Sequence, residues 1–189
     1  EAEPITRANL GRALATFVRA YVSDRAPYDQ YLRGDSLALD DAALRGMDVF
    51  AKLDCVSCHM PPRFESERYA ARHVPELVGI DDDGRFEVTA RAPDRGAFRV
   101  PTLRNARQTG PYFHNGTVAK FEDAVQHEVD EQVALGKPAP SAAELSDLLA
   151  FLRGSLSDTS REQHPPESVP SGLPIPLDGD RILRGGHEE

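Results

Sequence analysis

Apolar residues recur at helical spacing in four stretches of the chain. The first stretch predicts a helix over residues 6–22, with Thr6 suited to its N-cap. A second helix is expected over 40–53, where two aspartates stand at the positively polarised N-terminal end. A third is expected over 119–129, and a fourth over 141–154, which opens with the capping-box letters SAAE. The pattern therefore predicts a mainly α protein.

The stretches between these helices carry a weaker pattern. Residues 23–36 contain Pro and Gly and are expected to form a loop, and residues 63–100 are expected to be mostly irregular. Inside the second stretch, a DDG turn signal at 82–84 and the segment 85–89 indicate a brief hairpin. A helical turn is expected over 101–106.

Composition narrows the class of protein. With 189 residues, 40% of them hydrophobic, the chain can bury the core of one globular domain. No apolar run approaches the roughly 18–20 residues that a membrane-spanning helix needs. The formal net charge of −9 would repel a phosphate backbone, which argues against a nucleic-acid partner. The chain opens with the letters EAEP and shows no signal peptide, so we expect the mature form of an exported protein.

Both cysteines of the chain fall in one short segment, 55–59, which reads CVSCH. This is the attachment sequence for c-type haem. Two thiols three positions apart can each add to one vinyl group along an edge of the porphyrin, and the next residue places an imidazole beneath the iron. We therefore expect Cys55 and Cys58 to form thioether bonds and His59 to be the proximal iron ligand.

Three other interpretations of this motif compete with haem attachment. A structural zinc site would use Cys55, Cys58 and His59, but it needs a fourth ligand and usually has a second close pair. A dithiol redox motif would require a βαβ context that the helical pattern does not provide. A disulfide between the two cysteines would close a very small loop and stabilise little. The spacing favours haem.

Further segments resemble one family along most of the chain. Residues 96–105 read GAFRVPTLRN, and residues 109–116 read TGPYFHNG. Both closely resemble the C-terminal haem domain of the bacterial dihaem cytochrome c peroxidases and their MauG-like relatives. The segments NLGRALATF (9–17) and PYDQYLRG (27–34) are similar to the helix and loop that precede that domain, and FEDAV and LLAFLRG match further downstream. The resemblance covers residues 5–158.

The resemblance implies a cytochrome c-like helical haem domain with a long irregular insertion. In the family, the haem of this domain is an electron-transfer centre, and a second haem in an N-terminal domain reacts with peroxide. This chain carries one haem motif, so it is expected to be a fragment or subunit of a larger enzyme, or a single-haem protein. The expected parts are an interdomain-type helix and loop (1–36), the haem domain (37–158) and an extended or disordered Pro/Gly-rich tail (159–189).

The residue expected to bind the distal side of the iron differs from the family pattern. A Met shortly after the Ala-Val of the third helix binds the iron in typical peroxidases of the family, and a Tyr does so in MauG-like proteins. Counting from the AV pair at 124–125 places Glu128 there, with His127 just before it. We rank Glu128 first, His127 second and an open or water-bound site third. Without a role at the iron, Glu128 would be an exposed carboxylate in a charged run, and His127 a surface or hydrogen-bonded histidine.

Four other residues are candidates for the site. By resemblance, His114 belongs near the haem pocket and the interdomain surface, although it could simply be a loop histidine bonded to backbone. Arg104 could donate two hydrogen bonds to a haem propionate, or form an ordinary surface ion pair. The family also holds a calcium ion between its two haem domains, and two backbone carbonyls that bind it match Thr109 and Pro111.

Three functions follow from these features. The first is the electron-transfer half of a dihaem peroxidase or MauG-like oxidoreductase, which relays electrons between a small redox donor protein and a second, peroxidatic haem. The second is a single-haem enzyme that reacts with peroxide at an open or Glu/His-ligated iron. The third is a non-enzymatic monohaem carrier or sensor. The first hypothesis implies a second haem domain or subunit as partner, and thioether attachment indicates the periplasm. No catalytic residue is assigned.

Overall fold

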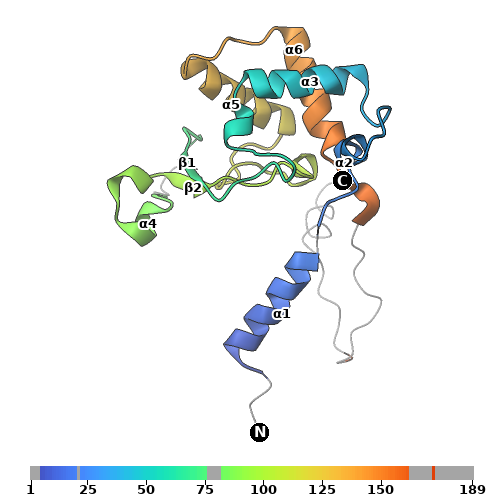
Figure 1. The fold of residues 1–189 in the computed structure, drawn as a ribbon. Coiled ribbons are helices and arrows are strands. Elements are labelled where there is room, and N and C mark those ends of the chain that lie inside the picture. The colour runs from blue at the N-terminus through green and yellow to red at the C-terminus, as the bar shows by residue number, and fades with distance from the viewer. Residues whose placement is uncertain (1–4, 21, 76–81, 162–171, 173–189) are drawn as a thin grey trace, which may run out of the picture. The chain divides into compact units, whose positions relative to one another are not determined.

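The computed structural model describes residues 5–20, 22–75, 82–161 and 172. It divides into a unit of residues 1–159 and a unit of residues 160–189. The helices are α1 (Arg7–Ala20), α2 (Pro27–Leu32), α3 (Asp41–Lys52), α4 (Phe86–Thr89), α5 (Phe121–Ala134) and α6 (Ala142–Ala150), and the strands are β1 (Tyr69–Ala71) and β2 (Ala97–Arg99) (Figure 1). Helix α6 continues as a π-helical turn, η4 (Phe151–Ser155), and single 3₁₀ turns cover Cys55–Ser57, Ala92–Asp94, Ala106–Gln108 and Thr159–Arg161. The predicted mainly α fold is confirmed.

Side-chain caps fix the starts of the two helices that pack most closely together. The Asp40 carboxylate accepts a hydrogen bond from the Ala43 amide at 2.7 Å, so α3 begins where the two aspartates predict. Ser141 and Glu144 form the predicted capping box, with bonds of 3.2 and 2.7 Å. Thr6 caps α1 through the Asn9 amide.

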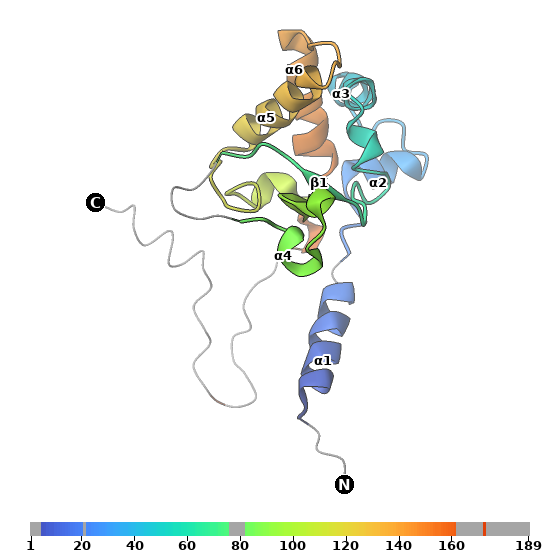
Figure 2. The same ribbon diagram turned by 90° about the vertical axis from the view of Figure 1, so that its left-hand side faces the viewer.

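Helices α3 and α6 lie side by side in both ribbon views (Figures 1 and 2) and form the main helix–helix contact of the first unit. The contact is close because α3 has no side chain at Gly46. A Cβ atom built there would lie 2.0 Å from the carbonyl oxygen of Asp147 and 2.8 Å from the Cβ of Phe151. The backbones of α3 and α6 therefore meet at this glycine.

We expect Gly46→Ala to destabilise the protein, although alanine favours helices. The methyl group must push α3 away from α6, and overpacking of this kind costs about 1–3 kcal/mol. Gly11→Ala is the matched control, because nothing lies within 4 Å of the position where its Cβ would stand in α1. It should gain about 0.5–1 kcal/mol from helix propensity alone. If denaturant titrations gave the two variants the same free energy of unfolding, the close contact between α3 and α6 at Gly46 would be contradicted.

An aromatic cluster forms the core beneath these helices. Phe64 meets Tyr28 with ring centroids 4.9 Å apart, and it meets Phe50 and Phe151 at 5.9 Å each, all edge to face. Phe64 and Phe151 are at most 1% exposed. Edge-to-face pairs add about 0.5–1.5 kcal/mol each beyond their burial. Because Phe50 also lines the cavity described below, the same core supports the floor of the site.

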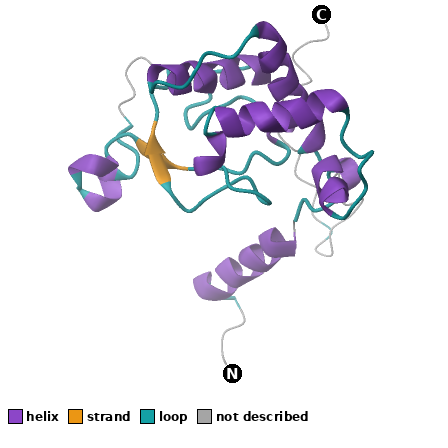
Figure 3. Ribbon diagram, turned by 45° about the horizontal axis from the view of Figure 1, so that its top comes forward, coloured by secondary structure: helices purple, strands orange, loops and turns teal. Residues whose placement is uncertain are grey.

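Several sequence-based expectations about the irregular regions are wrong. The stretch 23–36 contains α2, because Pro27 stands at the first helical turn, where proline is favoured, and does not act as a breaker. The segment expected to form a hairpin forms α4 instead. The strands are β1 and β2, which pair antiparallel (orange in Figure 3) across 25 intervening residues and so leave no local turn signal. The helical turn expected over 101–106 begins only at Ala106. The helix expected over 119–129 is α5, which continues to Ala134.

Helix α1 contributes little to the described core. No residue of α1 is buried, so its predicted apolar face is exposed within the described part of the chain. Almost all of the predicted tail, 159–189, lies outside the described residues, and the boundary at 36–37 stays a prediction. None of the helices described is both long and apolar enough to cross a membrane.

Stability should fall in acid partly through one carboxyl group on α6. The Lys52 ammonium, 2.6 Å away, together with the Ser141 cap lowers the pKa of Glu144 to about 2. A lowered folded-state pKa stabilises the fold above the unfolded pKa of about 4.5, and this contribution is lost as pH falls toward 2. In denaturant titrations between these pH values, Glu144→Gln should flatten the pH dependence. Glu87→Gln, which removes an exposed carboxyl group from α4, should leave it as steep as in the wild type.

Candidate haem site

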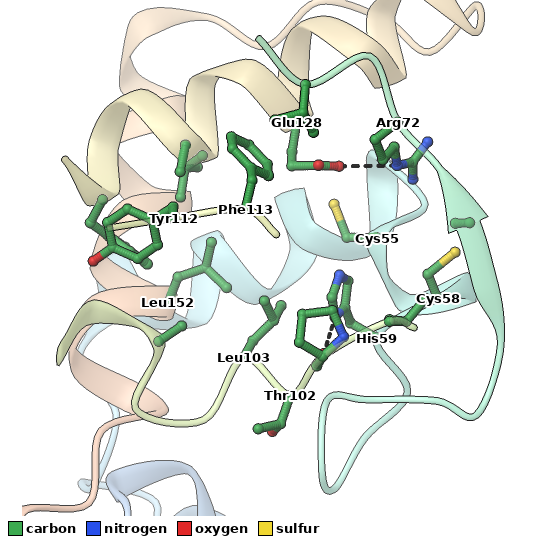
Figure 4. A pocket seen from close by; sticks show the side chains of 18 of the residues that line it. Cys55, Cys58, His59, Arg72, Thr102, Leu103, Tyr112, Phe113, Glu128 and Leu152 are labelled. Atoms are coloured by element: carbon green, nitrogen blue, oxygen red, sulfur yellow. Dashed lines mark hydrogen bonds and ion pairs between the residues drawn. The ribbon is translucent and has the colours of Figure 1, made fainter. Parts of the chain in front are cut away.

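A cavity of about 550 Å³ lies beside the aromatic core (Figure 4). Its walls come from α5, α6, the segment after α3, the residues around β1 and β2, and the loop 100–114. Most lining side chains are apolar, among them Phe50, Leu103, Phe113 and Leu152. Size and lining suit a large, flat, mainly hydrophobic ligand, since ligand pockets typically measure about 300–1,000 Å³.

The end of α3 delivers both cysteines to this cavity. After Leu53 the chain turns at Asp54, which has the left-handed φ of 63°, and then forms a 3₁₀ turn over Cys55–Ser57. The His59 amide donates to the Cys55 carbonyl at 2.9 Å. Cys55 and Cys58 are free thiols and both line the cavity, so the structure contains no disulfide between them. Burial, and secondarily the charge of Glu128, raise the pKa of the Cys55 thiol to about 12.

His59 is held in one tautomer. Its Nδ1 lies 3.1 Å from the carbonyl oxygen of Phe64 and 3.1 Å from that of Pro101. Carbonyl oxygens only accept hydrogen bonds, so Nδ1 carries the hydrogen and the lone pair is on Nε2. Burial lowers the pKa of His59 and favours the neutral ring, although the two carbonyls oppose this effect. A neutral imidazole oriented by backbone carbonyls is the usual form of a metal ligand.

The far wall carries a carboxylate. Glu128 extends from α5 into the cavity, and in the view of Figure 4 Cys55 lies between it and His59. Its Oε2 is 3.3 Å from Nε of Arg72, and its side chain is 36% exposed. Burial raises the pKa of Glu128, and the positive charge of Arg72 acts in the opposite direction. An ionisable group therefore faces His59 across an otherwise mostly apolar space.

Comparisons with known proteins show what the chain is similar to. No family model matches the chain. The cytochrome-c peroxidase IdrP1 of Pseudomonas sp. (strain SCT) is 31% identical over 207 residues, covering 88% of this chain and 54% of that protein. The methylamine utilization protein MauG of Methylorubrum extorquens is 36% identical over 160 residues, covering 79% of this chain and 44% of that protein. The crystal structure of a MauG-like protein associated with microbial copper homeostasis matches with a TM-score of 0.65 and 29% identity, covering 85% of this chain and 56% of that one.

The chain is a homologue of the cytochrome c peroxidases and MauG. It spans about half the length of the curated relatives that it matches.

The residues of the cavity fit the haem c of these relatives. Two thiols and an imidazole with an available Nε2 line an apolar cavity, which is the donor set that thioether attachment and proximal ligation require. The zinc alternative lacks its ligands, because the described residues contain no group of three or more His, Cys, Asp or Glu side chains that could hold a metal ion.

The two distal candidates are placed differently. Glu128 lines the cavity, whereas His127 is absent from the lining formed by the described residues. The His127 ring packs against Phe113 with centroids 5.0 Å apart, and its Nε2 is buried without a hydrogen-bond partner among the described residues. Of the two candidates, Glu128 is therefore the one that lines the cavity, and the identity of the distal ligand stays a prediction.

The four remaining candidates also differ in whether they line the cavity. His114 lines the cavity and stacks on Phe98, with ring centroids 3.6 Å apart and an interplanar angle of 7°. Thr109 and Pro111 also contribute to the cavity wall. Arg104 does not belong to that wall. Its guanidinium pairs with the Asp29 carboxylate at 2.6 and 2.7 Å, so the structure shows a buried ion pair where we expected a propionate contact or a surface pair.

Sequence analysis missed Arg72 as a site residue. It stands in the stretch 63–100, which has no helical or alternating pattern, and it reaches α5 only through the tertiary fold. An arginine in an irregular stretch gives no local signal of which carboxylate it will meet.

Proposed function

We propose that this chain is the electron-transfer half of a dihaem cytochrome c peroxidase or MauG-like oxidoreductase. The observation that carries the proposal is the joint placement of Cys55, Cys58 and His59 on the wall of one apolar cavity, in a homologue of the cytochrome c peroxidases and MauG. A bound haem c would supply reversible one-electron chemistry at its iron. The chain's own residues attach and orient that group, and the apolar walls keep water from it.

Each residue of the site has a defined role in this proposal. Cys55 and Cys58 hold one haem through thioether bonds, and Nε2 of His59 is the proximal ligand. Glu128 is the distal ligand, which its place on the opposite wall supports. His127 is the weaker alternative. An anionic oxygen ligand stabilises ferric iron, so we expect a lower reduction potential than a thioether ligand would give.

The partner is a second haem domain or subunit. The chain's share of its relatives' length supports this, since about half of each curated relative lies outside the match. The carbonyls of Thr109 and Pro111 would contribute to a calcium site shared with that partner, because such hard oxygen donors suit calcium. Electrons would come from a small redox donor protein in the periplasm.

One observation favours a second candidate function. Position 128 holds a carboxylate in place of the methionine or tyrosine of the relatives' pattern, and a labile distal ligand would let peroxide bind at this iron. The protein would then be a single-haem enzyme that reacts with peroxide without a second centre.

Native mass spectrometry of the protein purified from its own organism, combined with a potentiometric titration, separates these functions. The proposal predicts two haem centres that titrate at different potentials, carried by one longer chain or by two associated chains. A single chain with a single titrating haem would overturn it. A spectrum that changes when peroxide is added to that single haem would support the second candidate.

A further inference from the structure

The distal wall of the cavity contains an ion pair in mostly apolar surroundings. Arg72 and Glu128 both line the cavity, and their side chains are only 23% and 36% exposed (Figure 4). Removing two charges from water costs free energy that their mutual attraction seldom exceeds, so a partly buried pair is weak evidence of a stabilising role. Its place opposite His59 points instead to a role at the site.

The fold fixes where the Arg72 backbone lies. Arg72 follows β1 directly, and β1 is paired with β2 from Tyr69 to Ala71. Residues 70, 72 and 74 all line the cavity, and the Val74 amide donates to the Arg72 carbonyl at 3.0 Å, so the chain turns directly after the strand. The strand pairing therefore places the backbone that leads into Arg72 at the cavity wall.

Contacts on either side hold the same segment against the site. His73 Nδ1 lies 3.3 Å from Oε2 of Glu131, which stands one helical turn beyond Glu128 on α5. The Asn115 side chain donates to the Pro75 carbonyl at 2.8 Å. Together with the ion pair of Arg72 itself, these contacts join residues 72–75 to α5 and to the loop near His114.

The Arg72 side chain approaches the Glu128 carboxyl group inside the cavity. The closest contact joins Nε of Arg72 to Oε2 of Glu128, at 3.3 Å. A carboxylate has two oxygens, so a contact with one of them leaves a second oxygen that can serve as a ligand.

We propose that Arg72 is a positioning residue that holds the Glu128 side chain in the cavity across from His59, where it supplies an oxygen ligand to the distal side of the haem iron. This inference rests on the proposed function, because it requires a haem in the cavity. It assigns Arg72 no contact with the iron. It explains why a charged pair is retained in a largely apolar wall.

Ferric absorption and electron paramagnetic resonance spectra of the haem-loaded protein test this role. Arg72→Gln should shift both spectra away from those of the wild type and toward those of Glu128→Gln. Adding Arg72→Gln to Glu128→Gln should change nothing further, because the carboxylate to be positioned is already absent. Arg63→Gln is the matched control, since it removes the same charge from a side chain that is 75% exposed and pairs with Glu65 outside the described cavity wall, and it should keep the wild-type spectra.

The outcomes separate this inference from the proposed function. Covalent haem content is measured in every variant. A wild-type protein without covalent haem overturns both. If Arg72→Gln retains its haem and its spectra do not shift, only the role of Arg72 is overturned. That role is also overturned if Arg72→Gln shifts the spectra equally in the wild-type protein and in Glu128→Gln.

Discussion

The Cys55→Ser/Cys58→Ser double variant will lose all covalently bound haem. The chain has only two cysteines, so no other thiol can form a thioether bond. Both cysteines line the cavity that we assign to haem, and serine cannot form the bond. A haem stain of the denatured protein should fall to background, and intact mass spectrometry should give the mass of the bare chain.

Ser57→Ala is the control for this experiment. It changes one of the two residues between the cysteines and removes a hydroxyl group that donates to the Asp54 carbonyl at 2.9 Å, but it leaves the CxxCH spacing intact. It should retain its haem. Persistence of covalent haem in the double serine variant would show that the group is attached elsewhere and would contradict the assignment.

Asp29→Ala will be among the most destabilising single substitutions in the chain. The Asp29 and Arg104 side chains are only 11% and 9% exposed and form a bidentate pair. Removing the carboxylate leaves the guanidinium charge buried and unpaired, which typically costs about 3–5 kcal/mol. The free energy of unfolding in denaturant measures the loss.

A second bidentate pair provides a matched control. Arg45 binds Asp147 with bonds of 2.8 and 2.9 Å, but the Arg45 side chain is 60% exposed. The Asp147 side chain is 15% exposed, so this pair reaches solvent through its arginine. Ion pairs that reach solvent contribute about 0–1 kcal/mol, so Arg45→Gln should cost far less. If the two variants lose the same free energy, burial of the Asp29–Arg104 pair is not what makes it important.

Local sequence signals predicted the parts of the molecule that depend on neighbouring residues. The caps at Asp40 and Ser141 define helix starts through bonds to amides three residues away, so the sequence contains both partners. The CVSCH segment works in the same way, since its spacing alone presents two thiols and an imidazole together. Resemblance then added the position of Glu128, which the structure places in the cavity.

Contacts between distant residues could not be predicted from such signals. Arg104 was expected to bind a propionate or to form a surface ion pair, but its partner Asp29 lies 75 residues away on a helix that was itself expected to be a loop. The pairing of β1 with β2, which brings Arg72 to the cavity, likewise spans a long irregular segment. Neither contact leaves a periodic pattern in the sequence.

The central claim is that this cavity holds one covalent haem attached through Cys55 and Cys58. Trypsin cleaves after Lys52 and Arg63, so residues 53–63 form one peptide that contains the whole motif. Mass spectrometry of this peptide from the protein purified from its own organism tests the claim most directly. We predict the peptide mass plus that of one haem, with neither thiol open to alkylation. The bare peptide mass with two alkylated cysteines would contradict the account.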